Sequence, residues 1–236
     1  MTASREDGGL ENRRLYLCTP DRPDLEVFVD ACISGGIDVV QLRDKHLEAR
    51  ALLERARLCL RVCRAHGVPF ILNDRPDLAL EVDADGVHVG QDDAPARLAR
   101  QIVGQSKLVG LSTHAPDELT DALVEPVDYI SAGPVVATPT KPGRLGTGLG
   151  YVTLAAEACA GAGMPLFVTG DARPATVDSL VAAGARRVVA VRWLTEAADP
   201  RAAARALREA LDRAIDATPH RAERVGPWPH GQEPHR

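Results

Sequence analysis

The amino-acid sequence predicts a single α/β domain folded as a (β/α)8 TIM barrel. Eight short apolar runs rich in Val, Ile and Leu alternate with longer segments of helical period, the pattern of parallel strands separated by crossover helices. The chain has 236 residues and is 45% hydrophobic, which is enough to bury one sizeable core. An open doubly wound sheet is the alternative, because periodicity does not show whether the last strand meets the first. The count of eight favours the barrel.

The predicted strands, in chain order, are the apolar runs 15–18, 39–42, 70–72, 86–89, 108–111, 129–132, 166–168 and 188–191. Between and after them we expect helices over 24–34, 47–66, 94–103, 116–124, 151–160, 174–182 and 200–217. Pro116, Pro174 and Pro200 stand at helix starts, where the first turn tolerates a missing N–H. The polar ends lack period, so we expect a barrel over 14–217 between a flexible N-terminal segment, 1–13, and a disordered tail, 218–236.

Charge and composition exclude several classes of protein. The formal net charge of −5 argues against a nucleic-acid-binding surface, which usually carries a basic excess. The first fifteen residues lack the apolar stretch of a secretory signal, and every apolar run is too short for a membrane span, so we expect a cytoplasmic protein with small-molecule partners. The five cysteines form no CxxC pair and are interpreted as reduced core residues. The sequence is compatible with a homo-oligomer.

Polar residues follow the second predicted strand, where a parallel barrel places its chemistry. Alternation along the strand would send Gln41, Arg43 and Lys45 to the same side, toward the barrel mouth. The alternative is a solvated strand end at which Asp44 and Lys45 pair on the surface.

Carboxylates follow the third and fourth strands, on adjacent loops of the same rim. Asp74 and Asp93 are the candidate ligands, because Mg²⁺ is usually held by one or two carboxylates together with water and substrate phosphate oxygens. Each residue also has an ordinary structural interpretation: Asp74 as a turn former and Asp93 as the N-cap of a helix beginning at Ala94. The occurrence of the two carboxylates on adjacent loops favours a Mg²⁺ site.

Two further loops carry groups that suit phosphate. Ser112 follows the fifth strand, and a long loop with Lys141 follows the sixth, so hydroxyls, amides and a cation would gather beside the metal site. The alternative for the long loop is an ordinary flexible connection. Beyond the seventh and eighth strands, Gly170 and Arg192 lie where TIM barrels often bind a monophosphate. Two anion sites imply two phosphorylated substrates or one bisphosphorylated molecule.

The motifs QLRDK, ILNDR, DGVHVGQDD, GLSTH and ATPTKPG, followed by the closing strand, together resemble the thiamine-phosphate synthase family over about Leu15 to Arg213. The resemblance implies a transferase that uses one Mg²⁺ per subunit. It would condense hydroxymethylpyrimidine pyrophosphate with thiazole phosphate, or its carboxylated form, to thiamine phosphate and pyrophosphate. The route would be a dissociative pyrimidine carbocation, with the metal and nearby cations neutralising the departing pyrophosphate.

The resemblance also implies a role for each matching position. Gln41 and His88 would line the pyrimidine pocket, Asp74 and Asp93 would hold Mg²⁺, and Asn73 would bind pyrophosphate. The implied catalytic cations and hydroxyl, which also bind pyrophosphate, are Arg43, Lys45, Ser112 and Lys141. Positions implied near the thiazole or its phosphate are Thr138, Thr140, Gly170, Val191 and Arg192.

One substrate-binding position departs from the family pattern, which is glycine-rich after the seventh strand. Asp171 stands there, and its carboxylate would repel a phosphate. Either Asp171 caps the following helix, or Arg173 or Arg192 neutralises it.

Three other functions compete with the synthase. A related thiazole tautomerase would not need the groups for Mg²⁺ and pyrophosphate, and a non-catalytic sensor of thiamine precursors would lose part of the metal site. Another phosphate-binding barrel, such as an isomerase or aldolase, would carry a lysine or a paired acid and base inside the barrel. The presence of Asp74, Asp93, Arg43 and Lys141 favours the synthase.

Overall fold

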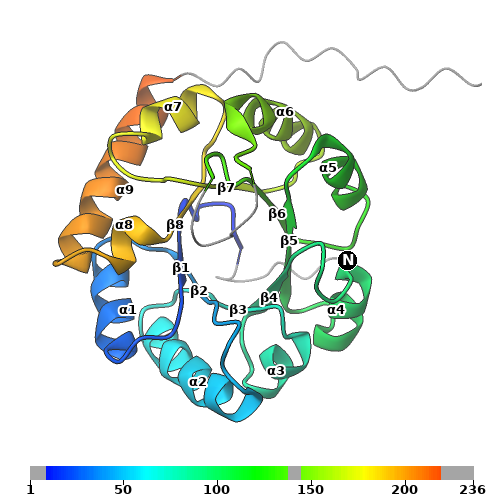
Figure 1. Ribbon diagram of the computed structural model, residues 1–236, viewed down its shortest axis with the longest axis vertical. Coiled ribbons are helices and arrows are strands. Elements are labelled where there is room, and N and C mark those ends of the chain that lie inside the picture. Colours follow the sequence, from blue (N-terminus) through cyan, green and yellow to red (C-terminus); the bar gives the residue numbers. More distant parts are fainter. Residues whose placement is uncertain (1–8, 138–144, 219–236) are drawn as a thin grey trace, which may run out of the picture.

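The computed structural model describes residues 9–137 and 145–218, and its strands form a closed parallel barrel. Neighbouring strands pair in chain order, and β1 pairs with β8, which closes the ring (Figure 1). The predicted TIM barrel is therefore confirmed over the open sheet. The strands are β1 Leu15–Thr19, β2 Val39–Leu42, β3 Phe70–Asn73, β4 Gly86–Val89, β5 Leu108–Thr113, β6 Tyr129–Ala132, β7 Leu166–Thr169 and β8 Val188–Ala190.

The helices surround the strands as an outer ring (Figure 1). They are α1 Leu25–Ser34, α2 Ala49–Ala65, α3 Pro76–Glu81, α4 Ala96–Val103, α5 Pro116–Ala122, α6 Gly148–Gly161, α7 Val177–Ala182, α8 Arg192–Thr195 and α9 Pro200–Ala217. Pro116 and Pro200 occupy the first helical position, as predicted. Pro174 does not, because α7 begins three residues later, at Val177. The sequence pattern missed the short helices α3 and α8, of six and four residues.

Side chains alternate between the two faces of the barrel wall. Outward-facing residues such as Leu17, Val40 and Leu72 pack against the helices in the larger core cluster. Inward-facing residues form a second cluster inside the barrel, in which Tyr16, Tyr129 and Phe167 are the large members. The three rings pack with centroids 5.2 to 6.1 Å apart. This aromatic layer fills the middle of the barrel and forms a floor beneath the strand ends.

A repeated aspartate fastens the bottom of the barrel. The residue immediately before each of β2, β4 and β6 is an aspartate, and its carboxylate accepts hydrogen bonds from backbone N–H groups at the start of the preceding strand. These residues are Asp38, Asp85 and Asp128. Before β8 the position is taken by Arg187, whose guanidinium donates to the carbonyls of Leu10 and Glu11. The bottom of the β7–β8 pair is thus held differently from the bottoms of the β1–β2, β3–β4 and β5–β6 pairs.

The segment 1–13, predicted to be flexible, is described only from residue 9. Within that part, Leu10 is buried in the inner cluster, and Arg13 donates to the carbonyl of Gly67. These contacts hold the chain against the bottom of the barrel, because burial of Leu10 and the bonds to Arg187 and Gly67 offset the entropy of ordering. Residues 1–8 and the predicted disordered tail beyond Thr218 lie outside the described residues.

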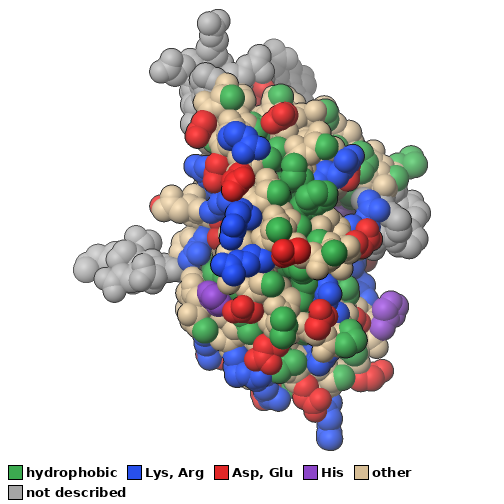
Figure 2. Space-filling view, turned by 90° about the vertical axis from the view of Figure 1, so that its left-hand side faces the viewer, with side chains coloured by type: hydrophobic (Ala, Val, Ile, Leu, Met, Phe, Trp, Pro, Cys, Tyr) green, Lys and Arg blue, Asp and Glu red, His purple; other side chains and the backbone are tan. Residues whose placement is uncertain are grey.

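The five cysteines are free and buried, as predicted. Figure 2 shows the side of the molecule that carries α1, α8 and α9 in Figure 1, and acidic and basic side chains are interspersed over it. In the described residues, every helix is too short or too polar to cross a membrane.

Candidate active site

Two adjoining pockets open at the carboxyl ends of the strands. The inner pocket, about 480 Å³, lies over the aromatic floor and extends to the loops after β7 and β8. The acidic pocket, about 520 Å³, lies between the loops after β2, β3 and β4. Arg43, Asn73, His88 and Ser112 line both. A ligand with two parts could therefore place one part in each pocket and be contacted at the junction by this shared set.

Lys45 joins the two candidate metal ligands in the acidic pocket. Its Nζ lies 2.8 Å from Asp74 Oδ2 and 3.5 Å from Asp93 Oδ1. The alternative pairing of Lys45 with Asp44 does not form, because the Asp44 carboxylate accepts from the backbone N–H groups of His46 and Leu47. The loop after β2 is thereby fixed by Asp44, and Lys45 is left to face the carboxylates.

Each of the two carboxylates has a local structural reason for its position. Asp74 has a left-handed backbone conformation with φ of 62°, and its N–H donates to the carbonyl of His88. Asp93 accepts from Gly90 N–H at 2.9 Å, which folds the loop after β4 back on itself. Asp93 is not a helix N-cap, since α4 begins at Ala96 and Pro95 precedes it. Asp74 is a turn former, as one interpretation held, and it also faces the pocket.

The charged side chains of Asp74, Asp93 and Lys45 shift one another's pKa values. Burial and the hydrogen bond with Asp93 raise the pKa of Asp74. Burial also opposes ionisation of Asp93, but its bonds with Asp74, Gly90 and Lys45 outweigh this and lower its pKa. For Lys45, burial acts against the charged form, while Asp74 and Asp93 prevail and raise its pKa. The pair of carboxylates thus concentrates negative charge at one place and retains a cation beside it.

The donor set of the acidic pocket fits Mg²⁺. Two carboxylates within 3.5 Å of one ammonium nitrogen are close enough to serve one cation. Among the described residues, groups of three or more His, Cys, Asp or Glu side chains placed to hold a metal are absent. Two hard oxygen ligands with an open side are what Mg²⁺ uses when phosphate oxygens and water complete its octahedron.

The floor of the inner pocket carries a continuous hydrogen-bonded chain of side chains. Gln41 Nε2 donates to the Tyr16 hydroxyl at 2.8 Å, and the hydroxyls of Tyr16 and Tyr129 lie 3.0 Å apart. His88 connects Tyr129 to Ser112, with Nδ1 3.1 Å from the tyrosine oxygen and Nε2 2.8 Å from Ser112 Oγ. Sequence reasoning did not single out Tyr16 or Tyr129. The available signal was a tyrosine at an inward position of an otherwise aliphatic strand.

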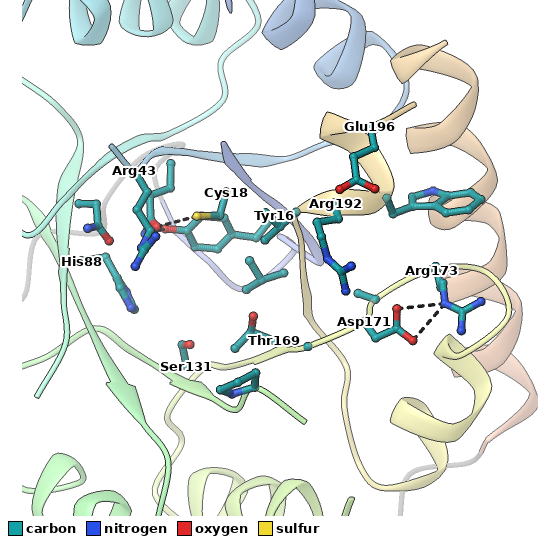
Figure 3. A pocket seen from close by; sticks show the side chains of 18 of the residues that line it. Tyr16, Cys18, Arg43, His88, Ser131, Thr169, Asp171, Arg173, Arg192 and Glu196 are labelled. Atoms are coloured by element: carbon teal, nitrogen blue, oxygen red, sulfur yellow. Dashed lines mark hydrogen bonds and ion pairs between the residues drawn. The ribbon is translucent and has the colours of Figure 1, made fainter. Parts of the chain in front are cut away.

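The far end of the inner pocket combines an anion with two cations. Arg173 Nε lies 3.0 Å from both oxygens of Asp171, and Arg192 lines the same pocket (Figure 3). In Figure 3 the Asp171–Arg173 pair stands at one end of the pocket, with His88 and Arg43 at the other. Asp171 does not cap α7, which begins at Val177 behind Thr176. The expected neutralisation is therefore provided by Arg173.

Gly170 gives this end of the pocket its shape. Its φ is 116°, and a Cβ there would come within 2.3 Å of Val135 N. Gly170, Asp171, Val191 and Arg192 all line the inner pocket, where the sequence analysis had placed a second anion. Gln41, Arg43, Asn73, His88 and Ser112 also line it, while Lys45, Asp74 and Asp93 line the acidic pocket. Thr138, Thr140 and Lys141 lie outside the described residues.

Known proteins resemble this chain over most of its length. Residues 15–194 match the model of the family described as thiamine monophosphate synthase. The thiamine-phosphate synthase of Saccharopolyspora erythraea is 49% identical over 211 residues, covering 86% of this chain and 94% of that protein. That of Thermus thermophilus is 48% identical over 203 residues, covering 84% and 97%.

A solved structure gives the same result. The thiamine phosphate pyrophosphorylase of Pyrococcus furiosus superposes with a TM-score of 0.77 at 26% identity, covering 86% of this chain and 96% of that one. A 3-hexulose-6-phosphate synthase, with a TM-score of 0.61 at 21% identity, shares the barrel fold. Because the family model spans the whole barrel from β1 to α8 and the relatives match at nearly half their residues, the chain belongs to the thiamine monophosphate synthase family.

Proposed function

We propose that this chain condenses hydroxymethylpyrimidine pyrophosphate with a thiazole phosphate, or its carboxylated form, in a Mg²⁺-dependent reaction. The observation that supports this most strongly is the junction of the two pockets. An acidic, cation-bearing pocket meets a mostly apolar one across Arg43, Asn73, His88 and Ser112. A heterocycle joined to a pyrophosphate has the same two parts, so its ring suits the inner pocket and its pyrophosphate the acidic pocket.

In this proposal Asp74 and Asp93 would hold Mg²⁺, which would supply positive charge beside the pyrophosphate. Arg43 and Lys45 add cationic charge from the loop after β2, and Asn73 and Ser112 add hydrogen-bond donors. Lys141 would approach from the loop after β6. Groups fixed before the reaction lose little reorganisation energy when charge develops, which is the largest contribution in many enzymes.

The second substrate would occupy the far end of the inner pocket. Gly170 lets the loop after β7 lie directly against the backbone of Pro134 and Val135. Arg192 lines this end of the pocket and supplies a cation in addition to Arg173, which pairs with Asp171. Thr138 and Thr140 would contact the thiazole, and Val191 its phosphate. A thiazole held there faces the ring in the inner pocket, so its nitrogen can attack without a nucleophilic side chain.

The reaction proposed is dissociative. The bond between the exocyclic CH2 and the pyrophosphate oxygen breaks, the electron pair leaves with pyrophosphate, and the pyrimidine amino group donates density to the cation. The thiazole nitrogen then supplies the electron pair for the new C–N bond. The apolar walls and the aromatic floor keep water from the cation, which would otherwise be hydrolysed. Gln41 and His88 orient the pyrimidine from that floor.

A tautomerase or a sensor would not require the acidic pocket. The close grouping of Asp74, Asp93 and Lys45 therefore favours the synthase over both. We also propose that the protein acts in the cytoplasm, a reducing compartment that suits five free, buried cysteines.

The direct test is to incubate the purified protein with both substrates, with and without Mg²⁺, and to follow thiamine phosphate and pyrophosphate. We expect equimolar products only when Mg²⁺ is present. Failure to form product with Mg²⁺ would contradict the proposal, and interconversion of thiazole isomers without the pyrimidine substrate would favour the tautomerase.

A matched pair of variants tests the acidic pocket. Asp74→Asn should lower kcat/KM about 100-fold at a fixed Mg²⁺ concentration, because a ligand charge is lost where pyrophosphate departs. Asp77→Asn changes an exposed carboxylate on the neighbouring helix α3, which pairs with Arg75. Steady-state rates for Asp77→Asn should stay close to those of the unaltered protein. Equal losses of rate in both variants would show that the acidic pocket has no specific role in the reaction.

A further inference from the structure

The hydrogen-bonded chain across the barrel floor has a definite direction. An amide nitrogen only donates, so the Tyr16 oxygen accepts from Gln41 Nε2. The Cys18 thiol lies 3.1 Å from Gln41 Oε1 and donates to it in this orientation of the amide. The single proton of Tyr16 is then available for its other partner, the hydroxyl of Tyr129. With the amide in this orientation, Tyr16 is the donor to Tyr129.

The same assignment of donors and acceptors extends from Tyr129 to Ser112. Tyr129 accepts from Tyr16, so its own proton is directed to His88 Nδ1, which must be unprotonated to accept it. A neutral imidazole with a bare Nδ1 carries its proton on Nε2, and that N–H donates to Ser112 Oγ. The Ser112 hydroxyl, already an acceptor, keeps its own proton to donate elsewhere. Ser112 lines both pockets at their junction.

Burial keeps the members of this chain in the required protonation states. Burial, followed by interaction with Tyr129, raises the pKa of Tyr16. Burial likewise raises the pKa of Tyr129, although the hydrogen bond with Tyr16 lowers it in part. Both phenols therefore keep their protons at neutral pH.

The packing around His88 and Tyr129 is also specific. Their rings stack with centroids 5.5 Å apart. Gly110 on β5 leaves the space that they fill, since a Cβ there would lie 2.1 Å from the Tyr129 ring and 2.5 Å from His88 Nδ1. Any side chain at position 110 would push the two groups apart. The hydrogen bond between them is thus held by the shape of the floor as well as by its chemistry.

We propose that Tyr16 and Tyr129 are positioning residues that hold His88 as the Nε2–H tautomer and so direct the Ser112 hydroxyl, as a donor, toward the pyrophosphate-bearing substrate. The tautomer part of this proposal concerns the protein alone, whereas the effect on rate rests on the proposed function. Ser112 touches the leaving group, and the tyrosines act through it. Donation to an oxygen that gains charge as the C–O bond breaks lowers the barrier more than it strengthens substrate binding.

The spectroscopic test uses the whole protein labelled with ¹⁵N in its histidine side chains, with the His88 signals identified by their loss in His88→Gln. We expect an unprotonated Nδ1 and a protonated Nε2 in the unaltered protein. Tyr129→Phe removes the donor to Nδ1 and should give a mixture of tautomers. A protonated Nδ1 in the unaltered protein would overturn the proposal, as would an unchanged spectrum in Tyr129→Phe.

The kinetic test compares two tyrosines. Tyr129→Phe should lower kcat about tenfold, the effect of about one hydrogen bond in the transition state, and leave KM nearly unchanged. Tyr151→Phe is the control, because its hydroxyl is also largely buried but donates to the carbonyl of Ala115 outside the barrel. We expect kcat of Tyr151→Phe to stay within about twofold of the unaltered value, as for a substitution away from the site.

A double variant separates positioning from a general structural effect. Adding Tyr129→Phe to Ser112→Ala should cause little further loss of kcat, because the hydroxyl that Tyr129 orients is already gone. Fully additive losses would overturn the proposal. If the unaltered protein made no product, the proposed function would fail, but the ¹⁵N spectra would still decide whether the tyrosines set the tautomer of His88.

Discussion

Asp171 is a carboxylate in a place that binds a phosphate in the proposed function, and its backbone explains how it is accommodated. Its φ of 58° lies in the left-handed region, which Asp tolerates better than most residues. Arg173 contacts both carboxylate oxygens at 3.0 Å. The Asp171–Arg173 pair is close to neutral as a unit. Arg173 therefore largely cancels the repulsion between Asp171 and a phosphate that the sequence predicts.

This leads to a prediction for Asp171→Gly. Glycine accepts the left-handed conformation and frees Arg173 to interact with the phosphate. The KM for thiazole phosphate should therefore fall or remain close to its present value, with kcat little changed, as measured by steady-state kinetics at saturating pyrimidine substrate. A loss of activity greater than about tenfold, more than one net hydrogen bond accounts for, would show instead that the carboxylate is needed.

Single residues also show what the sequence could and could not predict about the site. Asp74 and Asp93 were grouped from chain order, because consecutive parallel strands bring consecutive loops to one rim. Lys45 was directed to the same rim by alternation along β2. Tyr16 and Tyr129 were missed because each lies within an apolar run, where an aromatic residue is expected to pack. Only the geometry of the closed barrel shows that their hydroxyls meet at its centre.

The elements of the fold are joined by repeated local contacts, of which Asp38 gives the clearest example. Its carboxylate accepts from the N–H groups of Arg14 and Leu15 and from the guanidinium of Arg208 on α9. Only 12% of the side chain is exposed. One carboxylate therefore connects β1, β2 and α9, the last of which follows the barrel in sequence.

Asp38→Ala should lower the free energy of unfolding by about 2 to 4 kcal/mol, because it leaves buried donors and an arginine without their acceptor. Urea denaturation followed by circular dichroism measures this directly. Asp212→Ala is the matched control, since Asp212 pairs with the same Arg208 and with Arg14 but has 42% of its side chain exposed. Its cost should be about 0 to 1 kcal/mol. Equal costs would contradict the assignment.

Element boundaries follow the same physical logic. The eight strands were predicted from their apolar runs because each is buried on both sides, by helices outside and by side chains inside. The helices α3 and α8 were not predicted, since six and four residues give less than two turns of pattern. The equally short α7 was predicted only as part of a longer segment, 174–182. The start of α7 was placed too early because Pro174 stands in the loop before the helix rather than in its first turn.

At the scale of the whole molecule, the closed barrel was predicted from the count of eight strands and not from any local sign that the sheet closes. Closure depends on pairing between β1 and β8, which are the most distant strands in sequence. Local pattern contains no information about such a contact. A ligand that binds the rim of the folded barrel and not the unfolded chain should stabilise the fold.

Pyrophosphate together with Mg²⁺ should therefore raise the melting temperature of the protein. At a ligand concentration about 100 times the Kd, the gain is about 2.7 kcal/mol, or about 5 to 10 °C for a barrel of this size. Scanning calorimetry with EDTA in place of Mg²⁺, and with Asp74→Asn and Asp93→Asn, provides the comparison. A rise of the same size in any of these would show that pyrophosphate binds without help from the acidic pocket.

The departure of Arg187 from the aspartate repeat has a consequence for the order in which the barrel opens. β7 and β8 pair only at Val168 with Val188 and at Thr169 with Val189, whereas all of β4 pairs with β5. The β7–β8 pair also lacks the aspartate hydrogen bonds found at the bottom of the β1–β2, β3–β4 and β5–β6 pairs. Amide hydrogens of β8 should therefore exchange with deuterium sooner than those of β4. Gly170 and Arg192 stand directly above the β7–β8 pair. The pairing between strands is thus shortest beneath the far end of the inner pocket, where we propose that the thiazole phosphate binds.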